Sequence, residues 1–129
     1  NGPTGISNAT EIAVDNGVTC AIASGKLRCW GNGGFNRMDE DAPIEMESPH
    51  GLVMDGTHQA CVIGDRGVRC WGSVKIAEDK LISLGVPSAI ALSAYRICAI
   101  TIDGVKCVGR EYPYPYHDGQ NKVPPELGG

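Results

Sequence analysis

Six cysteines occur as three pairs, and eight residues separate the two members of every pair. The pairs lie in the stretches CAIASGKLRCWG, CVIGDRGVRCWG and CAITIDGVKCVG, which begin at Cys20, Cys61 and Cys98. Thiols can form disulfides or bind a metal ion, and the spacing distinguishes the two. Zinc ligands usually come in pairs roughly two to four residues apart, and the three histidines show no such spacing. We therefore expect disulfides and no metal site.

Each stretch is predicted to form a β-hairpin that brings its own two cysteines together. With a two-residue turn at residues 24–25, Cys20 lies opposite Cys29 in a non-hydrogen-bonded pair. Opposite Cβ atoms are closest in such pairs, which suits the short Cβ separation that a disulfide needs. The predicted disulfides are Cys20–Cys29, Cys61–Cys70 and Cys98–Cys107.

No other residues form a catalytic or cofactor-binding motif. The sequence has no G-x-S-x-G elbow, and pairing accounts for every cysteine, so no nucleophile is set up. The acidic run at residues 39–41 lacks the spacing of a calcium loop. The stretch GNGGF at residues 31–35 lacks the spacing of a phosphate loop. We expect a protein that is not an enzyme and needs no cofactor.

Two sets of residues are candidates for binding a ligand. The first set lies in the turn before each pair of cysteines, which varies while its flanks stay apolar. The second set lies in EYPYPYHDG, where alternating prolines keep the tyrosines extended and stiff. A tyrosine offers a flat apolar face and a hydroxyl, which suits sugar stacking and protein contacts alike. The candidate binding residues are Asn16, Thr57, His58, Tyr95, Arg96, Tyr112 and Tyr116.

Length and composition indicate what must position these residues. At 129 residues the chain is long enough for one domain with its own core. Eighteen glycines and eight prolines, with few helix-favouring runs, favour short strands and many turns. The net charge is −4 and the basic residues are scattered, so we expect no nucleic-acid partner. No run of about 18 apolar residues is present, so we expect no membrane insertion.

The cysteines also indicate a compartment. Six cysteines that all pair are typical of an oxidising environment. We expect a secreted, extracellular chain in its mature form, from which a leader peptide has been removed. The tripeptide NAT at Asn8 is a glycosylation sequon and agrees with this expectation.

The similarity between the three cysteine stretches extends upstream and indicates a repeat protein. The segments IAVDNGVTC, VMDGTHQAC and IALSAYRIC end at the first cysteine of each pair, and these cysteines are 41 and 37 residues apart. Each repeat of about 40 residues is predicted to contain a strand, a turn, the disulfide-linked hairpin and a fourth, outer strand. We expect one all-β domain over residues 1–129, with repeats at approximately 6–47, 48–85 and 86–129.

The repeats resemble a known family. CAIASGKLRCWG resembles the core of the regulator of chromosome condensation repeat, and IALSAYRICAI resembles the segment that opens each blade there. The tail YHDGQNKVPPELGG is similar to the linkers between blades, especially those of the propeller-type β-lactamase inhibitors. Val108 departs from the pattern, since the first two repeats carry Trp30 and Trp71 at that position. The recurrence of tryptophan at one repeat position predicts packing between blades.

The resemblance implies a β-propeller, in which the variable turns line one face of the ring and contact partners. Three blades of this size cannot enclose a stable central channel. We therefore expect a homodimer in which two chains form a ring of six blades. A β-trefoil, which also contains three units of similar length, is the alternative architecture.

These observations together predict a secreted recognition module without enzymatic activity. Carbohydrate binding of the lectin type is the first functional hypothesis, because repeated shallow sites on a symmetric scaffold gain avidity. A protein-binding enzyme inhibitor of the propeller type is the alternative that the resemblance implies. A structural protein of the extracellular matrix is the second alternative. The predicted partner is thus a glycan or an extracellular protein.

Overall fold

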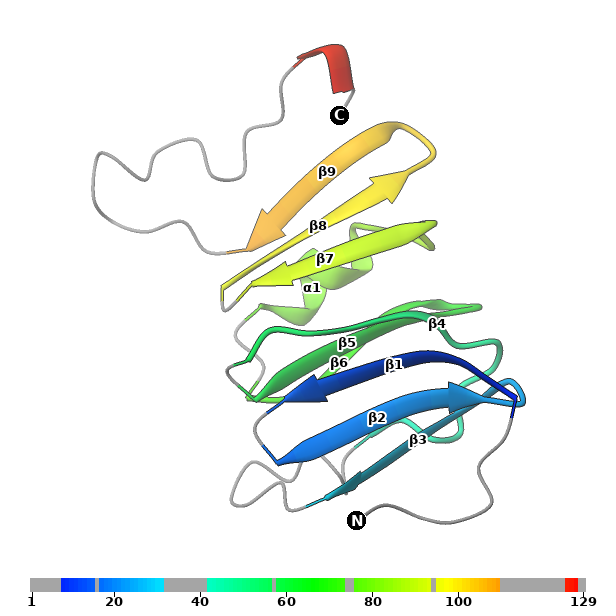
Figure 1. Cartoon of the computed structure of the whole chain (residues 1–129). Helices are drawn as coiled ribbons and strands as arrows, with labels where there is room; N and C mark the ends of the chain where they lie inside the picture. The colour runs from blue at the N-terminus through cyan, green and yellow to red at the C-terminus, as the bar shows by residue number, and fades with distance from the viewer. Residues whose placement is uncertain are drawn as a thin grey trace.

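The computed structural model describes residues 8–15, 17–31, 42–56, 58–73, 76–93, 95–109 and 125–127. Within these ranges the chain folds into three antiparallel sheets of three strands each (Figure 1). The first sheet contains β1 (Ala9–Asp15), β2 (Val18–Ala23) and β3 (Lys26–Gly31). The second contains β4 (His50–Met54), β5 (Gln59–Gly64) and β6 (Gly67–Gly72). The third contains β7 (Ala89–Ser93), β8 (Arg96–Thr101) and β9 (Gly104–Gly109), and a short 3-10 helix, η3, spans Pro125–Leu127.

The predicted hairpins and disulfides are confirmed. In the first sheet Cys20 lies opposite Cys29, and the hairpin turns at Ser24 and Gly25. Ser24 and Gly25 have φ values of 51° and 75°, and positive φ at both central residues matches the turn to the twist of the two strands. The second and third hairpins pair their cysteines in the same way, and the disulfides are Cys20–Cys29, Cys61–Cys70 and Cys98–Cys107.

The three sheets stack one on another in chain order (Figure 1). Strand β1 contacts β4, and β4 contacts β7, so the first strands of the three sheets lie next to one another. We call the face of a sheet that points toward the next sheet along the chain its forward face, and the opposite one its backward face. Glu11, on the forward face of the first sheet, accepts hydrogen bonds from the backbone N–H groups of Gly51 (3.0 Å) and Leu52 (2.8 Å).

Two separate hydrophobic cores lie between the sheets. The first core joins the forward face of the first sheet to the backward face of the second, and it includes Cys20, Ile22, Leu52, Val62 and Trp71. The second core joins the forward face of the second sheet to the backward face of the third, and it includes Cys61, Ile63, Ile90, Ile97 and Ala99. Successive residues of β5 therefore enter different cores, and all six of them are buried. This explains why QACVIG is a nearly continuous apolar run.

The second repeat differs from the four-stranded repeat that the sequence predicted, whereas much of the segment after β3 and nearly all of the segment after β9 lie outside the described residues. After β6 the second repeat continues into a helix, α1 (Glu78–Ile82), where the fourth strand was expected. Leu81 and Leu84 are three residues apart, so one side of this helical turn faces the second core, and both side chains are buried there. After β3 the described residues 42–49 form bends and turns rather than a strand.

The packing agrees with a propeller rather than with the β-trefoil. Each sheet consists of three consecutive strands and shares no strand with its neighbours in the described part of the chain. Complete sheets then pack face to face, as the blades of a propeller do. Among the described residues no helix is long and apolar enough to cross a membrane. The same residues contain no cluster of three or more His, Cys, Asp and Glu side chains suited to a metal ion.

Candidate functional site

The turns that precede the cysteine pairs all lie along one edge of the stack, which we call the rim. They join β1 to β2, β4 to β5 and β7 to β8, and in Figure 1 they lie at the left. The rim comprises residues 15–18, 55–59 and 93–96, of which 16, 57 and 94 lie outside the described residues. The three hairpin turns between the cysteines lie at the opposite edge, because successive strands run in opposite directions. The sequence prediction that these turns share one face is consistent with this arrangement.

Hydrogen bonds join the three turns of the rim to one another. The carboxylate Oδ2 of Asp15 accepts a bond of 2.9 Å from the backbone N–H of His58, which connects the first turn to the second. The amide Nε2 of Gln59 donates to Oδ2 of Asp55 (2.9 Å) and to the carbonyl oxygen of Ser93 (3.3 Å), which connects the second turn to the third. Asp15 and Gln59 are only 3% and 0% exposed. Buried, satisfied polar groups of this kind fix the turns relative to one another.

The three turns nevertheless differ in shape and in chemistry. The first and third turns contain two residues, because Asp15 pairs with Val18 and Ser93 pairs with Arg96. The second turn is one residue longer, since the backbone N–H of Asp55 bonds the carbonyl of residue 59 (3.1 Å). The turns therefore differ in their side chains: Asp15 of the first turn is buried, the second turn carries His58, and the third carries Tyr95, with Arg96 beside it on the third sheet.

Glycine at the end of the third strand lets each outer turn pack closely. Gly31 has φ 116° and Gly109 has φ 131°, a region that other residues rarely adopt. A Cβ atom at Gly31 would overlap the carbonyl oxygen of Gly17, and one at Gly109 would overlap the carbonyl oxygen of Tyr95. The glycine of the repeated Cys-Trp-Gly and Cys-Val-Gly ends is thus needed to support the rim.

The structure brings together part of the predicted binding set. His58 and Tyr95 lie on the rim and are half-buried. Arg96 is also half-buried, but it alternates with Ile97 and therefore lies on the forward face of the third sheet, at the end near the rim. The ring nitrogen Nδ1 of His58 is buried and has no hydrogen-bond partner among the described residues. The candidates outside the described residues are Asn16, Thr57, Tyr112 and Tyr116.

Asn8, the predicted glycosylation site, is exposed and precedes β1. Its carbonyl oxygen accepts a hydrogen bond of 3.1 Å from the backbone N–H of Ser24, in the first hairpin turn. Asn8 therefore lies at the edge opposite the rim. Glycosylation there stays a prediction.

Sequence reasoning missed the residues that hold the rim together. Gln59 occupies a repeat position that is Val18 in the first sheet and Arg96 in the third, so no periodic pattern marks it. Its only signal was a polar side chain at the start of an otherwise apolar strand. Nothing in the sequence marks Asp15 as the acceptor that connects two sheets.

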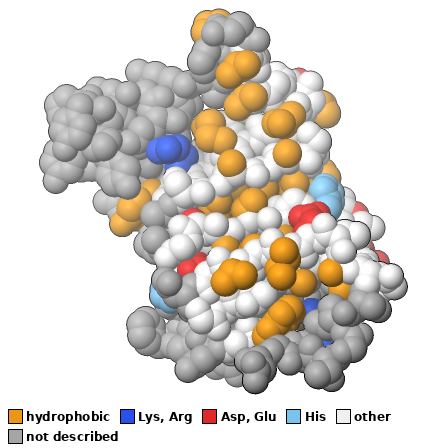
Figure 2. Space-filling model, viewed as in Figure 1, with side chains coloured by type: hydrophobic (Ala, Val, Ile, Leu, Met, Phe, Trp, Pro, Cys, Tyr) orange, Lys and Arg blue, Asp and Glu red, His pale blue; other side chains and the backbone are white. Residues whose placement is uncertain are grey.

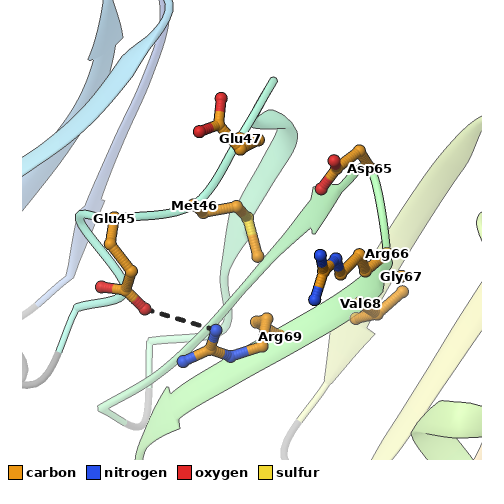
Figure 3. Close-up of a pocket in the computed structure, with 8 residues that line it drawn as sticks. All are labelled: Glu45, Met46, Glu47, Asp65, Arg66, Gly67, Val68 and Arg69. Carbon is orange, nitrogen blue, oxygen red and sulfur yellow. Dashed lines mark hydrogen bonds and ion pairs between the residues drawn. The ribbon is translucent and has the colours of Figure 1, made fainter.

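The edge opposite the rim carries two equivalent pockets. The first, of about 240 Å³, lies between residues 45–47 and the hairpin residues 65–69 (Figure 3). Figure 3 shows Arg69 pointing toward Glu45, and the two form an ion pair of 3.4 Å in which the side chains are 56% and 68% exposed. The second pocket, of about 360 Å³, lies at the same place in the third repeat. There Lys106 donates to the carbonyl of Ser83 (3.2 Å).

These two pockets connect each hairpin to the segment that precedes its sheet. Arg69 and Lys106 occupy the same repeat position, directly before the second cysteine of each pair. Both side chains donate a hydrogen bond to the preceding segment. This contact accounts for the recurrence of a basic residue at this repeat position. The rim instead brings three turns of different length and residue type side by side, and it is the better candidate for recognition.

No protein-family model matches the sequence, and a search of the curated proteins finds no match. Solved structures do resemble the fold. One is the CRINKLY WD40 ectodomain from the Arabidopsis thaliana receptor kinase ACR4, with a TM-score of 0.61 and 18% identity. Another is the entire ectodomain from the Physcomitrella patens receptor kinase CR4, with a TM-score of 0.61 and 19% identity.

These two likenesses cover 81% and 86% of this chain, but only 38% and 30% of the ectodomains. The chain thus spans well under half the length of either. At such low identity the likeness shows the fold alone, which is a propeller-like arrangement of repeats. The predicted propeller is therefore confirmed, whereas the resemblance to the regulator of chromosome condensation family is supported only at the level of a propeller-like repeat.

Proposed function

We propose that this protein is an extracellular recognition module that binds another protein through its rim. The observation that carries the proposal is the hydrogen-bonded connection of three chemically different turns along one edge, from Asp15 to His58 and from Gln59 to Ser93. A prearranged surface loses little conformational entropy on binding, and the histidine and tyrosine of the second and third turns suit contacts with a protein surface. Tyr95 is the most suitable anchor, because tyrosine is enriched among residues that dominate binding energy.

Two further observations support the extracellular setting. Three disulfides in a small domain are typical of proteins outside the cell. The similar solved structures are ectodomains of receptor kinases, so this fold operates outside the cell in those proteins. We propose binding rather than catalysis, since the sequence sets up no nucleophile or cofactor motif. A negatively charged chain without a basic stripe makes nucleic acid an unsuitable partner.

Carbohydrate binding of the lectin type is the second candidate function. The repetition of turns along one edge favours it, because multivalent lectins repeat one shallow site. The turns differ in length and residue type, however, and equivalent sugar sites would need similar residues. We therefore place a protein partner first and a glycan second.

The experiment presents the immobilised chain to a panel of extracellular proteins and to a glycan array. For any binder found, the dissociation constants of Tyr95→Ala and of Asp103→Ala are then compared with that of the unaltered chain. Asp103 lies in the third hairpin turn, at the opposite edge, and serves as the matched control. We expect Tyr95→Ala to weaken binding by about 1–3 kcal/mol and Asp103→Ala to leave it unchanged.

The remaining outcomes decide between the candidates. Binding to glycans without binding to proteins would favour the lectin function. A protein partner that is sensitive to Asp103→Ala and insensitive to Tyr95→Ala would place recognition at the opposite edge and refute the rim proposal.

A further inference from the structure

The outward faces at the two ends of the stack match the faces that are buried inside it. The chain forms the same kind of contact twice, since a forward face packs on the backward face of the next sheet in each core. The first sheet has a backward face, and the third sheet a forward face, without a neighbouring sheet in the described structure. Figure 2 shows hydrophobic side chains gathered over β1 and β2 near one end of the stack and over β7 to β9 near the other.

Equivalent residues on the forward faces show how a face covered by a neighbouring sheet differs from the forward face of the third sheet. Ile22, Ile63 and Ile100 occupy the same position, two residues after the first cysteine and opposite an apolar residue of the next strand. Ile22 and Ile63 are 2% and 0% exposed, because the next sheet covers them. Ile100 is 51% exposed.

The backward faces show the same relation. Ile12 lies opposite Ala21, and Ile90 lies opposite Ala99, at equivalent positions of their sheets. Leu52 takes this place in the second sheet, next to the bulge of β4. Leu52 and Ile90 are 8% and 9% exposed, whereas Ile12 is 69% exposed. Val14, two residues along the same face, is 68% exposed.

The two cores also define which residues belong together. Ile22 and Leu52 lie in the first core, and Ile63 and Ile90 lie in the second. Each core thus contains one such residue from a forward face and one from a backward face. Ile100 of the third sheet and Ile12 of the first sheet are the forward-face and backward-face residues at the same positions that lie in neither core. An apolar hollow of about 180 Å³ on the third sheet, lined by Ala91, Cys98, Ile100 and Val105 among others, is available to receive an aliphatic side chain.

We propose that the forward face of the third sheet docks on the backward face of the first sheet of a second copy of this chain. Ile100 then packs against Ile12 of the second copy, and two chains that dock in both directions bury all four end faces in one closed ring. The argument for a second copy is continuity, because the chain itself carries both halves of a contact that it already forms twice. Burial of the exposed aliphatic side chains supplies the driving force. The inference is independent of what binds the rim.

Arg96 adds a polar element to this contact. It occupies the repeat position of Val18 and Gln59, which are both completely buried. Gln59 donates to the carbonyl of Ser93 across the second interface, and Asp15 is the residue of the first sheet equivalent to Ser93. The guanidinium of Arg96 is therefore placed to donate to the backbone carbonyl of Asp15 in the second copy.

The test measures mass against chain concentration by light scattering and by sedimentation velocity. We expect the unaltered chain to reach twice its mass of 13.6 kDa. Ile100→Lys and Ile12→Glu should each raise the dissociation constant by about ten-fold or more, because a charge is buried in the contact. Ile102→Glu is the control, since Ile102 is 99% exposed at the hairpin turn, away from the docking face. Circular dichroism and mapping of the disulfides check that every variant folds.

Mixing the variants tests the head-to-tail geometry. An equimolar mixture of Ile100→Lys and Ile12→Glu leaves one contact with two unaltered faces and places the introduced lysine against the introduced glutamate in the other. We expect the mixture to recover dimers that neither variant forms alone. A chain that stays monomeric at all concentrations would overturn the proposal. Dimers that survive either single substitution, or that Ile102→Glu disrupts equally, would also overturn it.

Discussion

The middle sheet and the two end sheets have closely related sequences, yet they differ in what covers them. Strand β5 is buried along its whole length, because cores lie on both of its faces. Strand β8 alternates instead, with Ile97 and Ala99 buried against the second sheet and Ile100 exposed on the other side. In β8 the apolar run is therefore buried only on the face that has a neighbouring sheet. Position in the stack decides whether the isoleucine at one repeat position is buried, as Ile22 and Ile63 are, or exposed, as Ile100 is.

Replacement of the repeated tryptophans should show this difference most strongly. Trp71 is 5% exposed in the first core, whereas Trp30 is half-buried on the backward face of the first sheet, which has no neighbouring sheet among the described residues. We expect Trp71→Ala to lower the free energy of unfolding by about 3–5 kcal/mol and Trp30→Ala by less than half as much. Urea unfolding followed by circular dichroism measures both, at a concentration where light scattering reports single chains. Equal losses would contradict the distinction between covered and open faces.

Removal of disulfides should give the next largest effect. We compare two double variants, in which alanines replace Cys61 and Cys70 or replace Cys98 and Cys107. Each should lower the free energy of unfolding by about 2–4 kcal/mol, because the unfolded chain gains conformational freedom. Replacing Cys61 and Cys70 should lower the free energy of unfolding by about 1 kcal/mol more than replacing Cys98 and Cys107. The reason is that Cys61 is completely buried in the second core and Cys98 is not. Thermal melts of the two double variants compare them directly. A larger loss at Cys98–Cys107 would argue against the stated cores.

The rim is expected to respond more weakly. Asp15→Ala removes the acceptor of the backbone N–H of His58 and leaves a donor without a partner, which should cost about 1–3 kcal/mol. Asp15→Asn keeps an oxygen acceptor at the same place and should retain most of the stability. Arg96→Ala, at the open end of the stack, should have almost no effect on a single chain. Urea unfolding of the three variants tests whether Asp15→Ala loses the most unfolding free energy and Arg96→Ala the least. A loss in Asp15→Asn equal to that in Asp15→Ala would show that the charge of Asp15, rather than its hydrogen bond, is what stabilises the rim.

The smallest effect is expected at the edge opposite the rim. Arg69 and Glu45 form an ion pair in solvent, and such pairs contribute only about 0.2–1 kcal/mol. Arg69→Ala should therefore barely change the thermal midpoint, and high salt should abolish the remaining difference by screening. A loss comparable to that of Asp15→Ala would show that the hairpin contact is as important as the rim.

Local features of this protein could be predicted from the sequence because they depend on residues close together in the chain. A two-residue turn and a fixed cysteine spacing determine the hairpin register, so the pairing of Cys20 with Cys29 followed from geometry alone. Repetition of that unit also indicated the class of fold. The same reasoning placed a fourth strand in the second repeat and missed α1, because the helix is stabilised by Leu81 packing into a core that forms only in three dimensions.

The sequence by itself determined the hairpins, the disulfides and the three-unit β architecture, since these arise from spacing and turn chemistry within a few residues. Only the tertiary structure decided that three separate turns form one rim, because the bonds that join them connect residues 43 and 34 positions apart. It also decided which isoleucines are covered, since Ile63 and Ile100 have the same place in their repeats and differ only in having a neighbouring sheet. A contact between distant segments leaves no periodic signal in the chain, and burial is a property of what surrounds a residue.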